Sequence, residues 1–160
     1  MADIIAAIKS KSIFGSLPVF KRLDSWSNWL VALKAAFALP MDPAELEVYR
    51  KYTGRQTAPT VPPSELWFIV GRRGGKSFMA ALVTVFLAVF VKWPLGLEKG
   101  YLMIIACDRR QAGVVFQYVK RILELPAFKA LVAKELAEEI WLTNNVVIAV
   151  QTSSYRAVRG

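Results

Sequence analysis

A glycine-rich segment in the middle of the chain has the residue types that bind phosphate groups: Gly71-Arg72-Arg73-Gly74-Gly75-Lys76-Ser77. Backbone N–H groups that converge at the start of a helix bind phosphate oxygens, and glycine allows the tight wrap that this requires. A lysine then reaches the terminal phosphates, and a Ser or Thr hydroxyl binds Mg²⁺. The segment predicts a site for ATP and Mg²⁺, with Lys76 on the phosphates and Ser77 on the metal. The alternative is a glycine-rich turn that contains a Lys-Ser pair by chance.

Two details of this segment depart from the general phosphate-binding loop. The strict pattern has a glycine six residues before the lysine, but Val70 stands there and Gly71 follows it. Two arginines lie inside the loop, and an arginine at such a place can stabilise the charge that builds on a transferred phosphoryl group. Arg72 and Arg73 are therefore candidates for this role; otherwise they face solvent or pair with a carboxylate.

The composition excludes several other kinds of site. The chain has 160 residues with one cysteine and no histidine, which rules out an internal disulfide, a His-ligated zinc site and a Ser-His-Asp triad. Cys107 follows an apolar run and is predicted to be a buried strand residue. Basic residues number 21 and acidic residues 12, for a net charge of +9. This balance favours a polyanionic partner such as nucleic acid, or a nucleotide, although a globular domain with a basic surface has it too.

Apolar runs flank the loop on both sides. The run 65–70 is short and rich in β-forming residues, which predicts a strand buried on both faces of a parallel sheet. The loop is expected to lead into a helix over 76–93. Its apolar run, 78–91, is shorter than the roughly 20 residues that a membrane span needs, so we interpret it as a buried helix and expect no membrane contact.

The pattern further along the chain alternates between strands and helices. We predict a buried strand at 101–106, a helix at 109–125 capped by Asp108, another helix at 128–136, and two strands within 140–150 about an Asn144-Asn145 turn. Before the loop, the pattern predicts a short N-terminal helix, a helix from Asp24 or Ser25 to about 39, a helix over 44–52 capped by Asp42, and a Pro- and Thr-rich loop at 53–63. This order describes an α/β sandwich.

Four segments together resemble the large terminase subunit of tailed bacteriophages. They are the loop 71–77, Thr53-Gly-Arg55 with the run 65–70, Asp108-Arg-Arg-Gln-Ala112, and Tyr155-Arg-Ala-Val-Arg-Gly160. The resemblance spans about residues 26–160, and the loops of that family commonly lack the strict first glycine. It implies a P-loop NTPase-type α/β sandwich with a mainly parallel sheet, and it divides the chain into a helical arm with lead-in helices (1–52) and the first part of the ATPase domain (53–160).

The resemblance also implies an activity and its partners. Such a protein hydrolyses ATP to move double-stranded DNA into a procapsid, as a ring that is pentameric in the family. It works with the portal protein and the small terminase subunit, in the cytoplasm of the host bacterium and transiently at the procapsid portal. Two alternatives stay open: another P-loop DNA-dependent ATPase, such as a helicase-like protein, or a truncated nucleotide-binding module without turnover.

Further site residues follow from the resemblance alone. It makes Arg72 a candidate finger acting within its own subunit and Arg159 a candidate finger acting on the neighbouring subunit's ATP. Arg55 and Gln56 are expected at the adenine, although Arg55 can equally be a solvated loop arginine. The family's Walker B strand, which ends in the catalytic Asp-Glu pair, and its nuclease domain would follow residue 160. We therefore expect the 160-residue chain alone to be inactive as an ATPase.

Overall fold

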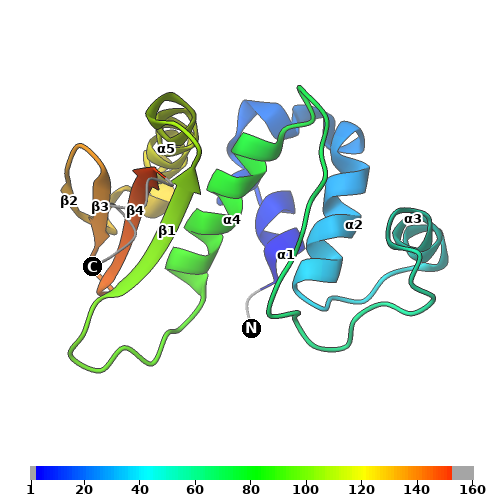
Figure 1. Ribbon diagram of the computed structural model, residues 1–160. Helices are drawn as coiled ribbons and strands as arrows, with labels where there is room; N and C mark the ends of the chain where they lie inside the picture. Colours follow the sequence, from blue (N-terminus) through cyan, green and yellow to red (C-terminus); the bar gives the residue numbers. More distant parts are fainter. Residues whose placement is uncertain (1–2, 153–160) are drawn as a thin grey trace. The chain divides into compact units, whose positions relative to one another are not determined.

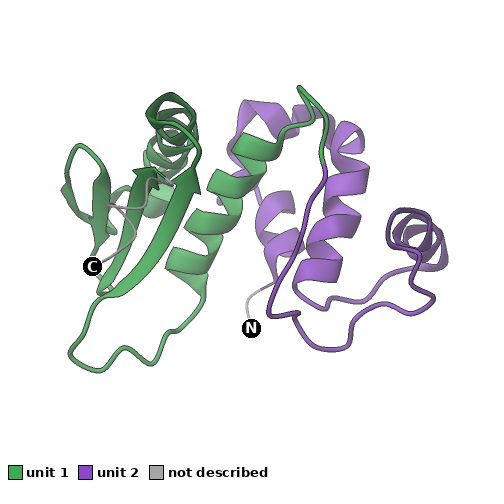
Figure 2. Ribbon diagram, viewed as in Figure 1, with its two compact units in different colours: residues 1–2, 70–160 green, residues 3–69 purple. Residues whose placement is uncertain are grey.

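The computed structural model of the chain describes residues 3–152, which form two compact units (Figure 2). The first unit comprises residues 3–69 and is built from helices, and the second comprises residues 70–152 and contains a four-stranded sheet. The elements in chain order are α1 (Ile4–Lys9), η1 (Phe14–Ser16), η2 (Pro18–Trp26), α2 (Ser27–Ala36), α3 (Pro43–Thr53), α4 (Lys76–Phe90), β1 (Gly100–Ala106), α5 (Arg109–Leu123), α6 (Pro126–Lys129), β2 (Val132–Glu135), β3 (Glu139–Leu142) and β4 (Val146–Thr152).

Side-chain caps set the start of two helices in the first unit. The carboxylate of Asp3 accepts hydrogen bonds from the N–H groups of the first turn of α1. Asp42 caps α3 as predicted, in a capping box completed by Glu45, which satisfies two donors that the helix leaves open. The predicted cap at Asp24 or Ser25 is wrong, because the 3-10 helix η2 covers both residues and α2 begins at Ser27 without a side-chain cap.

The sheet of the second unit has the strand order β1-β4-β3-β2 (Figure 1). β1 and β4 are parallel, whereas β3 is antiparallel to both of its neighbours. The sheet over residues 100–152 is therefore mixed, not mainly parallel as expected. The reason is local: a short turn through Asn144 and Asn145 joins β3 to β4, and a connection this short can join only antiparallel strands. The positive φ of 65° at Asn145 makes this turn possible.

Helices α4 and α5 pack against each other and against the sheet (Figure 1). The apolar run predicted as a buried helix forms α4, in which Leu82, Val85 and Phe86 are fully buried. α5 is capped by Asp108 as predicted and buries Phe116, Val119 and Ile122. Across residues 3–152 we find no helix that is long and apolar enough to cross a membrane.

The apolar run before the loop does not form the predicted strand. Residues 65–70 are extended but belong to no sheet, and Trp67 and Ile69 are 84% and 103% exposed. An apolar run becomes a strand only where a neighbouring strand takes up its backbone hydrogen bonds, and the four strands described here all lie in 100–152. The segment makes local contacts instead: the Trp67 indole N–H donates to Glu65 at 3.0 Å, and the Phe68 ring lies 5.7 Å from that of Trp29.

Three further expectations are corrected in the second unit. The helix predicted over 128–136 is replaced by the one-turn helix α6 and by β2, because pairing with the edge of β3 satisfies the backbone of Val132–Glu135. The strand predicted at 101–106 is present as β1, but alternate residues along it are exposed. Cys107 is exposed too, since it lies after the end of β1 and before the cap of α5.

Candidate phosphate-binding loop

The loop begins with a tight turn from Gly71 to Gly74. The N–H of Gly74 donates to the carbonyl oxygen of Gly71 at 3.3 Å, which closes a four-residue turn. Arg73, the third residue of the turn, has a φ of 62°. Such left-handed values cost a non-glycine residue energy, and the tight turn imposes this conformation on Arg73.

A steric contact fixes the residue type at one glycine. A Cβ atom added to Gly74 would lie 2.4 Å from Cγ1 of Val70 and 3.2 Å from the carbonyl oxygen of Gly71. A side chain at position 74 would therefore require the Val70 side chain or the turn to shift. A Cβ at Gly71, in contrast, would meet no atom within 4 Å. The residue that departs from the strict motif, Val70, is thus the residue that packs against the turn.

The loop ends at the N-terminus of α4, which has no acidic or side-chain cap. Gly75 is the N-cap residue with a φ of 79°, and the first turn of α4 contains no acidic residue. The first backbone bond of the helix runs from the N–H of Met79 to the carbonyl oxygen of Gly75, so the N–H groups of Lys76 and Ser77 have no acceptor within the helix. These donors and the helix dipole favour an anion at this end.

Three basic residues lie at or just before this helix end: two in the Gly71–Gly74 turn and one as the first residue of α4. Arg72, Arg73 and Lys76 are all exposed, and none of them takes part in an ion pair with a carboxylate of residues 3–152. The predicted alternative of a pairing with a carboxylate therefore does not apply within this range. The loop presents three positive charges beside uncapped N–H groups, and this arrangement fits the phosphate groups of a nucleotide.

Ser77, the predicted Mg²⁺ ligand, is half-buried in the first turn of α4. Its hydroxyl oxygen is the kind of hard ligand that Mg²⁺ takes, and this ion usually keeps most of its coordination shell for water and phosphate oxygens. Within residues 3–152 no group of three Asp, Glu, Cys or His side chains is placed to hold a metal ion. The residues present thus fit an Mg²⁺ that binds mainly through the nucleotide.

Two other predicted site residues belong to the first unit, whereas the loop belongs to the second. Arg55 and Gln56 lie directly after α3 in the first unit, where the Arg55 N–H donates to the Thr53 hydroxyl at 3.2 Å and Arg50 donates to the Gln56 carbonyl at 2.9 Å. Their contact with adenine stays a prediction. Arg159 lies outside the residues that the structure describes, so its role as a finger stays a prediction as well.

The contact between Val70 and Gly74 is the feature of the site that the motif did not reveal. The sequence contains one signal for it: a bulky residue stands where glycine is usual, and glycine stands four residues later.

In comparisons with known proteins, no family model, no curated protein and no solved structure matches this chain.

Proposed function

We propose that this protein binds ATP through the loop 71–77 and works as the nucleotide-binding part of an ATP-driven motor that moves double-stranded DNA, as the likeness to terminase large subunits implies. The observation that carries the proposal is the uncapped N-terminus of α4, at which Gly75 has a left-handed conformation and Arg72, Arg73 and Lys76 are unpaired within residues 3–152.

Each group at the loop has a task in this proposal. The N–H groups at the start of α4 donate to phosphate oxygens, and Lys76 neutralises the terminal phosphates. Ser77 contributes a hydroxyl ligand to Mg²⁺, which when bound neutralises charge on the phosphate oxygens. Arg72, exposed beside the helix end, is the candidate for stabilising the charge that develops during phosphoryl transfer.

The decisive experiment is Lys76→Ala, followed by titration calorimetry with ATP and Mg²⁺. Hydrogen bonds between a lysine and phosphate oxygens contribute about 1.5–3 kcal/mol, so we expect at least a 10-fold loss of affinity, to below detection if the parent binds weakly. Lys76 is exposed, and circular dichroism should show an unchanged fold.

Lys92→Ala is the matched control, because Lys92 is an exposed lysine just beyond the other end of α4. This variant should bind ATP like the parent. Equal ATP affinity for the parent and Lys76→Ala, with both proteins folded, would refute the assignment of the loop.

A further inference from the structure

One row of side chains crosses the sheet on the face that carries the exposed residues of β1. The register pairs Tyr101 with Val147, Val147 with Trp141, and Trp141 with Lys134. Residues paired in neighbouring strands have their side chains on the same face of a sheet. Lys134, Trp141, Val147 and Tyr101 therefore form one row from β2 to β1, which we call the aromatic row.

The β1 end of this face is open. Tyr101, Met103 and Ile105 alternate along the strand and are 54%, 46% and 50% exposed. The residues between them in β1 are less exposed, and α5 contacts both β1 and β4. The helices thus cover the opposite face. On the other face the ring of Tyr101 is accessible at the β1 end, whereas its neighbour in the row, Val147, is buried.

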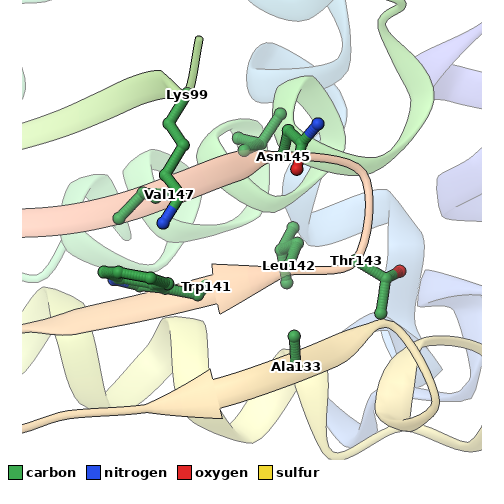
Figure 3. Close-up of a pocket in the computed structure, with 8 residues that line it drawn as sticks. Lys99, Ala133, Trp141, Leu142, Thr143, Asn145 and Val147 are labelled. Carbon is green, nitrogen blue, oxygen red and sulfur yellow. The ribbon is translucent and has the colours of Figure 1, made fainter. Parts of the chain in front are cut away.

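Two lysines lie on the indole ring of Trp141. In Figure 3 the Lys99 side chain points toward the Trp141 ring. The Nζ atom of Lys99 is 3.2 Å from the ring centroid, and that of Lys134 is 5.3 Å from it. The ring borders a cavity of ≈ 250 Å³ that Lys99 and Val147 also line. Trp141 is held in place because its indole N–H donates to the carboxylate of Glu139 at 2.7 Å. The ring therefore positions both ammonium groups by cation–π attraction.

Neither lysine has a carboxylate partner in the part of the chain that is described. The ion pairs there are Lys34–Glu45, Arg50–Glu47, Arg109–Glu138 and Lys120–Glu135. The face thus combines an accessible tyrosine ring with two lysines that form no ion pair within residues 3–152, and with the Glu139 carboxylate at the Trp141 indole N–H. The spacing between strands places Tyr101 about 10 Å from Trp141 along the row.

We propose that this face binds single-stranded nucleic acid, with a base stacked on Tyr101 and phosphates at Lys99 and Lys134. Open sheet faces with aromatic rings accept bases in this way, because every base has a flat π-face and single strands leave it accessible. The positive charges of lysines beside the rings attract the phosphate groups of the nucleic-acid backbone. In a duplex the base faces are stacked inside the helix, so the row favours single strands.

The test is fluorescence anisotropy with a labelled oligo-dT strand and a duplex of equal length, on the full 160-residue chain without ATP. The duplex is the control, because the proposed function expects the chain to bind duplex DNA as well, and its affinity should be the same for the parent and Tyr101→Ala. Tyr101→Ala should weaken single-strand binding about 5- to 100-fold, because it removes one stacked base. Tyr101→Phe keeps the ring and should bind like the parent.

Charge variants test the phosphate contacts separately. Lys99→Gln/Lys134→Gln should lower the magnitude of the salt slope, log K against log [salt], by about 1.4, which is two contacts of about 0.7 each. The control is Arg121→Gln/Lys129→Gln, which removes the same charge from exposed positions on α5 and α6 and should leave that slope unchanged.

Three results would overturn the proposal: an equal loss of duplex and single-strand binding in Tyr101→Ala, unchanged single-strand affinity in folded Tyr101→Ala, or no binding of the single strand at low salt. Lys92→Ala, at an exposed lysine outside both the aromatic row and the loop 71–77, should bind oligo-dT like the parent. Tyr101→Ala should keep the ATP affinity of the parent, so failure of this inference is distinguished from failure of the proposed nucleotide site.

Discussion

Val70 lies close to Gly74 in the candidate phosphate-binding loop, which leaves little space for a side chain at position 74. We expect Gly74→Ala to lower stability by about 1–3 kcal/mol, the usual cost of forcing an extra carbon into occupied space, and to weaken ATP binding. Gly71→Ala is the matched control, since its new Cβ would meet open space. Thermal unfolding and ATP titration of both variants test this.

A second substitution shows whether the clash is the cause. In Val70→Ala/Gly74→Ala the Cγ1 atom that lies 2.4 Å from the added Cβ position is gone, so most of the lost stability and affinity should return. If Gly74→Ala behaves like Gly71→Ala, or if the double variant is no better than Gly74→Ala, the contact does not shape the loop.

The start of α5 depends on a single carboxylate. Asp108 accepts a hydrogen bond from the N–H of Gln111 at 2.8 Å, and this bond lowers the pKa of the Asp108 carboxyl below its ordinary value. A folded pKa below the unfolded one means that the carboxylate stabilises the fold above the unfolded pKa, and that this stabilisation is lost as the pH falls through the folded pKa.

We therefore predict a pH-dependent difference between the parent and Asp108→Asn, which keeps an acceptor for the cap but no charge. The parent should unfold at a higher temperature than Asp108→Asn at about pH 6. This difference in unfolding temperature should shrink as the pH falls below about 4. Asp108→Ala, which removes the acceptor, should unfold at a lower temperature at both values. Thermal unfolding by circular dichroism measures all three. A constant difference between parent and Asp108→Asn at every pH would contradict the prediction.

The two compact units are joined through a long stretch without regular structure. Residues 54–75 lie between α3 and α4 and contain neither helix nor strand, and the loop arginines within it are exposed. Proteases cut exposed irregular segments of this kind first. We expect trypsin to cleave early after Arg72 or Arg73. The products are an N-terminal fragment that ends in the loop and a C-terminal fragment that begins in it.

Ligands should protect this site selectively if the proposed function is right. ATP with Mg²⁺, and inorganic triphosphate as well, should slow cleavage after Arg72 and Arg73 but not after Lys92, an exposed lysine just beyond α4. Protection of Arg55 by ATP but not by triphosphate would support the predicted adenine contact. Mass spectrometry of the fragments over time gives the result, and equal cleavage at the loop with and without either ligand would count against phosphate binding there.

The sequence alone predicted the features whose cause is local. The caps at Asp42 and Asp108, the buried helix after the loop and the turn at Asn144-Asn145 follow from residue type and spacing, because capping, helical periodicity and turn conformation involve neighbours in the chain. The glycine-rich motif likewise located the loop, and the start of α4 has no side-chain cap because its N-cap residue, Gly75, has no side chain.

Only the tertiary structure decided what depends on partners distant in the sequence. The runs 65–70 and 101–106 look alike in the sequence, but only the second forms a strand, because only it lies beside β4. Residues 132–135 form a strand because β3 takes up their backbone bonds. The contact of Lys99 with Trp141, 42 residues away, and the open face around Tyr101 arise from the strand register, which no local pattern specifies.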